Sequence, residues 1–267
     1  MEKKIGFIGL GNMATAIMGG LIAKKMAKPQ YVIGYDKLAT ASEKARENYK
    51  ITVAIDEKVV AEAADFLILA VKPNVLPEIL PKIGKVIRKN TVIISIAAGK
   101  SIAFLEEGLG RTDLKVVRCM PNTPALVLEG CTGVCANKNV TKGEMDSVLK
   151  LLGSFGKASV IPEKLMDVVV GISGSSPAYV FMFIEAMADA AVLAGMPRAQ
   201  AYEFSAQAVL GSAKLLLETG KHPGELKDMV CSPGGTTIEA VKVLEEMGFR
   251  ASVMDAVEAC IEKSKNI

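Results

Sequence analysis

This sequence has little of what several common kinds of active site require. Its 267 residues include one histidine, His222, and nothing around it indicates a Ser–His–Asp triad. The five cysteines are spread along the chain, and no histidine or second cysteine pair accompanies Cys131 and Cys135 at zinc spacing. We therefore expect no metal site, and a reduced cytosolic protein with ordinary buried thiols.

An excess of charge of one sign is also missing. The 32 basic and 29 acidic residues give a net charge of +3, which provides no basis for binding nucleic acid or a membrane surface. The opening Met1 to Lys4 leads directly into a predicted strand without a signal-peptide pattern, so we expect a cytoplasmic location. Half of the residues are hydrophobic, and the length allows about two globular domains.

The stretch from Ile5 to Ala14 has the pattern of a nucleotide-binding turn. A short apolar run, of a length that suits a buried parallel strand, breaks at Gly9 and Gly11 and continues as a helical pattern. The glycines permit a tight turn and close approach of a ligand, and Ala14 lets the helix pack on the strand. A pyrophosphate can bind the amides at that helix N-terminus. The alternative is a tight turn in another kind of α/β domain.

An acidic residue downstream supports the dinucleotide interpretation. A second predicted strand over 31–35 ends at Asp36, about 20–25 residues beyond the glycines. A carboxylate at this position can bond the 2′-hydroxyl of a ribose and repels a 2′-phosphate. Lys37 can offset part of that repulsion. Asp36 therefore predicts that NADH is used well.

Strands alternate with helices as far as residue 161. The apolar run over 65–71 ends at Lys72 and Pro73, because proline cannot continue a central strand. Ala70 to Pro73 therefore lies at a carboxyl strand end, where open α/β sheets bind ligands. The pattern predicts a doubly wound parallel sheet of the Rossmann type over residues 1–161. Further strands are predicted over 51–54, 91–96, 115–120, 130–136 and 158–161, and helices over 39–48, 57–64, 76–88, 102–107 and 142–155.

Residues 162–267 carry no strand pattern and predict an all-α second domain. The first predicted helix, 177–194, is apolar nearly all round, which is typical of a fully buried helix or of a membrane span. Glu185 and Asp189 in its middle, and flanks without anchoring residues, disfavour a span. A domain of this size rarely buries such a helix alone, so we expect a subunit interface. The other helices are predicted over 198–219, 223–230, 236–247 and 251–265.

A second glycine turn precedes the helix at residue 236. Gly234 and Gly235 lie before its N-terminus, and the hydroxyls of Thr236 and Thr237 lie at its start. This arrangement is a candidate anion site, which a small carboxylate substrate would fit. Ordinary N-capping by serine and threonine is an equally good explanation.

The chain resembles the pyrroline-5-carboxylate reductase family over essentially its whole length. The first matching stretch is shared by many nucleotide-binding folds, whereas the last is highly specific. The stretches are Phe7 to Ala14, Ala70 to Pro73, Ser95 to Gly99, Met120 to Ala125, Gly174 to Tyr179 and Asp228 to Ala240.

The resemblance implies that hydride passes from NADPH or NADH to the imine carbon of 1-pyrroline-5-carboxylate, giving L-proline. It implies an interlocked homodimer, often assembled into larger rings, with each active site between the nucleotide domain of one subunit and the helical domain of another. The cofactor is expected on Ile8, Gly9, Leu10, Gly11, Asn12, Met13, Asp36, Ala70, Val71, Lys72, Pro73, Ala97 and Ala98. The substrate is expected on Ser175, Ser232, Gly234, Gly235, Thr236 and Thr237.

Catalysis by such an enzyme is mostly positioning, because a protonated cyclic imine already accepts hydride well. Thr237 is the candidate catalytic residue, bonding the substrate's nitrogen or carboxylate. The position of Lys72 in the family indicates that it contacts the cofactor. Solvent can provide the proton for the imine. Two positions depart from the family pattern. Many members carry Ser, Thr or Arg near Asp36 and prefer NADPH, and many have a ribose-contacting Asn where this chain has Glu57.

Two other functions stay open from the sequence. A 3-hydroxyacid dehydrogenase resembles this architecture but needs a catalytic lysine on the first long helix of the second domain, and residues 177–194 contain none. A non-catalytic nucleotide sensor would need Gly9 and Gly11 but not the turn from Ser232 to Thr237.

Overall fold

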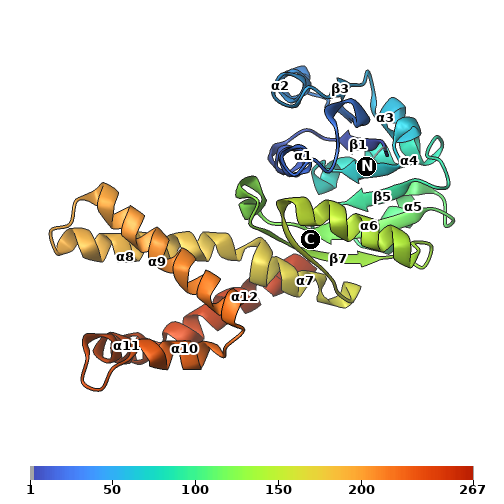
Figure 1. The fold of residues 1–267 in the computed structure, drawn as a ribbon. Coiled ribbons are helices and arrows are strands. Elements are labelled where there is room, and N and C mark those ends of the chain that lie inside the picture. Colours follow the sequence, from blue (N-terminus) through green and yellow to red (C-terminus); the bar gives the residue numbers. More distant parts are fainter. Residues whose placement is uncertain (1–2, 267) are drawn as a thin grey trace. The chain divides into compact units, whose positions relative to one another are not determined.

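An eight-stranded sheet organises the chain up to Val160 (Figure 1). The computed structural model describes residues 3–266, and its strand order is β3-β2-β1-β4-β5-β6-β7-β8. Every predicted strand is present. The strands are β1 Ile5–Ile8, β2 Val32–Tyr35, β3 Thr52–Val53, β4 Phe66–Leu69, β5 Val92–Ser95, β6 Lys115–Met120, β7 Gly130–Ala136 and β8 Gly156–Val160.

One strand pair departs from the predicted parallel sheet. β6 and β7 are antiparallel, with Val117 opposite Ala136 and Met120 opposite Gly133. The connection from Pro121 to Glu129 contains only the 3₁₀ turn η3, Thr123–Val127. It is shorter than the roughly dozen residues that a parallel crossover needs. The sheet is therefore mostly parallel rather than wholly parallel.

Helices cover both faces of this sheet and create two cores. On one face α1, α2 and α6 pack against residues such as Phe7 and Phe66. On the other face α3, α4 and α5 pack against residues such as Ile8 and Leu67. The strands are apolar on both sides because both faces are covered. The helices are α1 Asn12–Ala23, α2 Ala39–Tyr49, α3 Glu57–Ala63, α4 Leu76–Gly84, α5 Ile102–Leu109 and α6 Lys142–Leu152.

Helix α4 ends at Gly84, four residues before the predicted end at residue 88. A Cβ at Gly84 would lie 2.1 Å from the carbonyl oxygen of Leu109 at the end of α5. The glycine therefore permits close helix packing there, and glycine is also a poor helix former.

A buried hydroxyl on β7 lacks a partner. Thr132 is 1% exposed, and its Oγ1 has no hydrogen-bond partner within residues 3–266. Burying a polar group without a partner costs free energy that an apolar group of the same shape avoids. We expect Thr132→Val to raise the free energy of unfolding by about 1 kcal/mol, seen as a melting temperature about 2 °C higher.

Thr91 provides the matched control for this substitution. It is equally buried, at 1% exposed, but its Oγ1 donates a hydrogen bond of 2.8 Å to the carbonyl of Ala64. Thr91→Val should therefore lower the melting temperature. Equal shifts in the two variants would show that the unpaired hydroxyl of Thr132 has no energetic cost.

The two compact units of the chain divide it differently from the expected boundary between residues 161 and 162. Unit 1 extends to Ser175 and includes the chain again from Cys260, and unit 2 is Ser176–Ala259. The segment after β8 contains α7, Met166–Val169, and the π-helical turn η6, Val170–Gly174. Met166 is buried in the sheet's second core, and the Ser264 hydroxyl donates to Asp167 at 2.7 Å. These contacts hold both segments on unit 1.

Helices alone make up the chain beyond Val160 within the described residues, as predicted (Figure 1). α8 and α9 pack against each other, and Arg198 pairs with Asp189 between them at 2.5 Å. The rings of Phe183 and Phe249 join α8 to α12, with centroids 6.1 Å apart. The helices are α8 Ser176–Leu193, α9 Arg198–Thr219, α10 Pro223–Val230, α11 Thr236–Glu246 and α12 Phe249–Lys265.

Helix α8 is mostly exposed in the single chain, and Ala188 is its one fully buried residue. Its exposed apolar side chains include Phe181 and Met182. The single chain therefore does not provide the burial expected for this helix. By length and composition alone, the helical stretch Glu163–Leu193 is long and apolar enough to cross a membrane, but Glu185 and Asp189 lie within it.

Candidate active site

The glycine turn lies at the carboxyl ends of β1 and β4, as predicted. Gly9 has a φ of +93°, and its amide donates to the carbonyl of Tyr35 at 2.8 Å. A Cβ at this position would lie 2.6 Å from the carbonyl oxygen of Ala70. Both the conformation and the close packing therefore require glycine at residue 9.

Gly11 is glycine for a different reason. Its φ of −76° is accessible to any residue, and a Cβ there would meet nothing within 4 Å. It is the N-cap of α1 and provides no side-chain cap, so the first amides of the helix, at Asn12 and Met13, keep no helical partner. This open helix N-terminus is suited to an anion that approaches the backbone closely.

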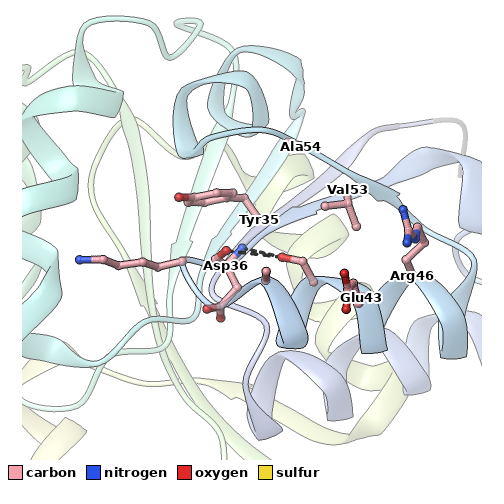
Figure 2. A pocket seen from close by; sticks show the side chains of 9 residues that line it. Tyr35, Asp36, Glu43, Arg46, Val53 and Ala54 are labelled. Carbon is pink, nitrogen blue, oxygen red and sulfur yellow. Dashed lines mark hydrogen bonds between the residues drawn. The ribbon is translucent and has the colours of Figure 1, made fainter.

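Asp36 joins the end of β2 to the glycine turn. Its Oδ2 accepts a hydrogen bond of 2.8 Å from the amide of Leu10, and its Oδ1 accepts one of 2.9 Å from the amide of Leu38. Its own amide donates to Ser42 Oγ at 3.3 Å, as Figure 2 shows. Each carboxylate oxygen keeps a further lone pair. The residue therefore has a structural role in addition to the ribose contact expected for it.

A pocket of about 340 Å³ lies between the end of β2 and helix α2, and Figure 2 shows it from close by. Tyr35 and Asp36 lie at one end and Arg46 at the other. The pocket is open, and two of its four charged residues, Glu43 and Arg46, come from α2.

The main cleft beside the glycine turn has a volume of about 440 Å³. It brings together seven of the predicted cofactor residues, which are Ile8, Gly9, Gly11, Asp36, Ala70, Val71 and Lys72. An adjacent pocket of about 360 Å³ includes Leu10, Gly11 and Asn12. The remaining predicted residues, Met13, Pro73, Ala97 and Ala98, lie outside these two clefts. Ala97 and Ala98 follow β5, beside β4 at the same edge of the sheet.

These residues fit a dinucleotide. The Gly9 turn and the open Gly11 form a cradle that side chains would fill, and the free amides of α1 suit a pyrophosphate. The main cleft extends from this cradle past Asp36 to the wall formed by α4, with room for a nucleoside.

The far wall of this cleft was not predicted from the sequence. Val75, Glu78, Ile79 and Lys82 line it, all from α4 or the turn before it. Glu78 and Lys82 are four residues apart on a helix that begins soon after the ligand-binding end of β4. That spacing puts them on one helix face, and it is the signal that could have identified them.

The predicted substrate turn in unit 2 has the expected form. The amide of Gly235 donates to the carbonyl of Ser232 at 3.0 Å, and Gly234 has a φ of +65°, as in a type II turn. Gly235 is the N-cap of α11 and provides no side-chain cap. Thr236 and Thr237 are the first residues of the helix, so their hydroxyls and the helix amides lie together.

Ser175, the sixth predicted substrate residue, belongs to unit 1 and follows the π-helical turn. Its amide donates to the carbonyl of Val170 at 2.8 Å, and its Oγ lies 3.2 Å from Cys260 Sγ. Asn122 supports this segment, because its Nδ2 donates to the Ser173 carbonyl at 2.9 Å and its Oδ1 accepts from the Cys131 amide at 2.8 Å. This role of Asn122 was not predicted.

Cys119 and Cys135 are buried and provide no reactive group. Burial raises the pKa of the Cys135 thiol to about 11 and also raises the pKa of the buried Cys119 thiol, so both stay protonated at neutral pH. The expectation of buried thiols is wrong for Cys131, which is exposed. Within residues 3–266, no three His, Cys, Asp or Glu side chains are grouped to hold a metal ion.

Two family models match the two parts of this chain. Residues 163–267 match pyrroline-5-carboxylate reductase dimerisation, and residues 4–99 match NADP oxidoreductase, coenzyme F420-dependent. The pyrroline-5-carboxylate reductase of Escherichia coli is 54% identical over 267 residues, covering 100% of this chain and 99% of that protein.

Solved structures give the same result. A pyrroline-5-carboxylate reductase from Coxiella burnetii has a TM-score of 0.93 at 32% identity, covering 100% of this chain and 98% of its own. The pyrroline carboxylate reductase of Plasmodium falciparum, solved with NADP bound, has a TM-score of 0.89 at 34% identity, covering 99% and 97%. Identity at this level over the full length, with both the nucleotide fold and the helical region present, shows that the chain belongs to the pyrroline-5-carboxylate reductase family.

Proposed function

We propose that this protein is an NAD(P)H-dependent reductase that converts 1-pyrroline-5-carboxylate to L-proline. The observation that carries the proposal is the full-length match to the family, in a chain that also holds a dinucleotide cleft and a second glycine turn suited to a carboxylate. Bound NAD(P)H supplies the hydride for the C=N carbon of the substrate.

The chain's own contribution is to bind and orient. The amides at the start of α1 hold the pyrophosphate, and Asp36 and the cleft beyond it hold the adenosine half. The nicotinamide half contacts residues at the carboxyl ends of β4 and β5, which are Val71, Lys72, Pro73, Ala97 and Ala98. Positioning of this kind accounts for a large share of the acceleration when the acceptor is already electrophilic.

The substrate side of the proposal rests on unit 2. The amides at the start of α11 and the Ser232–Gly235 turn bind the substrate carboxylate. Ser175 is a further proposed substrate contact. The Thr237 hydroxyl bonds the ring nitrogen or the carboxylate, which fixes the imine carbon toward the cofactor. We assign Thr237 as the catalytic residue on this basis.

Cofactor choice follows from the charges near the ribose. NADPH use is supported by the NADP-bound relative, whereas a carboxylate at residue 36 favours the free 2′-hydroxyl of NADH. We expect purified protein given 1-pyrroline-5-carboxylate to oxidise both cofactors, with NADH rates within about tenfold of NADPH rates. Loss of absorbance at the wavelength of the reduced nicotinamide measures both reactions in parallel.

The outcomes of this assay separate the alternatives. A margin for NADPH much wider than tenfold would contradict the argument from Asp36. Oxidation of neither cofactor, in folded protein that binds them, would overturn the proposed reaction and favour a nucleotide sensor or another reductase of the same architecture.

We further infer a homodimer formed through the helical region, in an arrangement that can extend to a ring. The family model for residues 163–267 is one of dimerisation, and the apolar side chains of α8 are exposed in the single chain. We also propose a cytoplasmic location, because the five cysteines are odd in number and scattered along the sequence.

A charge placed on α8 tests the dimer. Phe181 is 65% exposed, and Phe181→Asp should convert the dimer or larger species to monomers in sedimentation measurements. Ile55→Asp is the matched control, because Ile55 is 86% exposed but lies on unit 1. An unchanged oligomer in Phe181→Asp, or a monomeric parent protein, would exclude this interface.

A further inference from the structure

Three charged side chains form a bridge along one wall of the nucleotide cleft. Lys82 Nζ on α4 lies 2.9 Å from Glu78 Oε1 and 3.3 Å from Glu57 Oε1. Glu57 is the first residue of α3, so the lysine links two helices. The Glu57 side chain is 13% exposed, whereas that of Lys82 is 42% exposed. Lys82 thus reaches from solvent to a mostly covered carboxylate.

This bridge faces the same cleft as Asp36. The charged residues that line the cleft are Asp36, Lys37, Glu57, Lys72, Glu78 and Lys82. Three acids and three bases meet there, and no charge of one sign prevails. The hydrogen bond from Lys82 lowers the pKa of Glu78, and Lys37 adds to that effect from the β2 side. The two edges of the cleft are therefore close enough for their charges to interact.

Lys82 is suited to exchange partners within this cleft. An ammonium group has three donors, and the four-carbon stem lets it swing between acceptors. A phosphate dianion attracts it more strongly than a carboxylate does. Lys37 is exposed at the rim, and Lys72 lies at the end of β4, toward the expected nicotinamide side. Lys82 is the base that two carboxylates already hold along the cleft wall.

We propose that Lys82 is a specificity-determining residue that admits the 2′-phosphate of NADPH beside Asp36, by leaving Glu57 to bind that phosphate. Glu57 then competes with the phosphate for Lys82 and limits the gain in NADPH affinity, so that NADH would also be used. The inference rests on the nucleotide site of the proposed function. Asp36 alone can only disfavour the 2′-phosphate of NADPH, whereas Lys82 favours it.

Binding of nucleotide fragments tests this without turnover. Calorimetry on the full-length protein would compare adenosine 2′,5′-bisphosphate with adenosine 5′-monophosphate, which differ by the 2′-phosphate alone. Lys82→Met keeps the apolar stem and should weaken binding of the bisphosphate about tenfold while leaving the monophosphate unchanged. Glu57→Gln should strengthen binding of the bisphosphate severalfold. Lys85→Met, an exposed lysine at the end of α4, is the matched control and should change neither.

A variant without either carboxylate separates a direct contact from a released repulsion. In Lys82→Met the carboxylates of Glu57 and Glu78 are left without their cation and repel the phosphate. If Lys82 binds the phosphate itself, Lys82→Met added to Glu57→Gln with Glu78→Gln should bind the bisphosphate about tenfold more weakly than Glu57→Gln with Glu78→Gln alone. Equal affinities in those two proteins would overturn the proposal.

Other outcomes are equally decisive. Equal weakening of both fragments by Lys82→Met, with a lowered melting temperature, would mean that the bridge only joins α3 to α4. Unchanged binding of both would exclude any role for Lys82. If the unaltered protein binds both fragments but reduces no 1-pyrroline-5-carboxylate, the reaction fails while this test of the cleft stands.

Discussion

Replacing Gly11 with alanine should leave the fold intact and weaken the binding of NADPH and NADH about a hundredfold. The backbone at Gly11 already has a φ that alanine adopts, and a Cβ would meet nothing within 4 Å. That open space lies at the junction of the two clefts beside the glycine turn. The added methyl group would occupy it and hold the pyrophosphate away from the α1 amides. Fluorescence titration of each reduced cofactor measures the loss.

Gly9→Ala is the contrasting variant. There the Cβ would lie 2.6 Å from the carbonyl oxygen of Ala70, and the φ of +93° is strained for alanine. We expect a large fall in melting temperature, with a cost on the order of 2–4 kcal/mol. Normal stability with lost cofactor binding in Gly11→Ala would show that glycine at residue 11 leaves room for the ligand, whereas glycine at residue 9 is required for folding. Undiminished binding in Gly11→Ala would mean that the pyrophosphate does not lie on this turn.

Thr237→Ala should lower kcat/KM for 1-pyrroline-5-carboxylate about a hundredfold and leave cofactor affinity unchanged. A hydroxyl that bonds the reacting ring contributes on the order of two powers of ten when the bond strengthens along the reaction. Thr237 belongs to unit 2, at the start of α11, whereas the glycine turn belongs to unit 1. Steady-state rates with cofactor titrations on the same preparation measure both quantities.

Thr219→Ala is a matched control in the same helical unit. Its hydroxyl donates to the Leu215 carbonyl near the end of α9 at 2.7 Å, so its removal has only a local effect on the helix. If Thr237→Ala keeps full activity, the assignment of Thr237 fails. If both threonine variants lose activity and melt earlier, the loss reflects stability rather than chemistry.

The sequence predicted the strands well because their signals are local. Phe66 to Leu69 is apolar throughout, as a strand covered on both faces must be. The glycine turn was also predictable. The backbone conformation requires glycine at residue 9, and room for a ligand favours glycine at residue 11. The start of α11 after its glycine turn was predictable for the same kind of reason, and its binding of substrate stays a prediction. In each case the residues of one short segment are enough to predict the local structure.

Features that depend on two distant segments were missed. The antiparallel β6–β7 pair depends on how a short connection turns the chain back, and the register follows from pairing rather than from composition. The bond from the Leu10 amide to Asp36 joins residues in two separate turns. The ion pair between Lys82 and Glu57 joins α4 to α3. Such contacts follow from the folded arrangement, and no pattern within one segment predicts them.

The return of the chain to unit 1 has a consequence for engineering this protein. Ser175 and Cys260 are 85 positions apart in the sequence, yet their side chains lie 3.2 Å apart. Residues 176–259 are therefore an insertion whose entry and exit points are adjacent. A simple truncation after residue 175 would remove the terminal helix segment that Asp167 holds through Ser264, and one after residue 161 would remove Asp167 as well. A short peptide joining residue 175 to residue 260 would instead excise the insertion and keep every segment of the nucleotide-binding module.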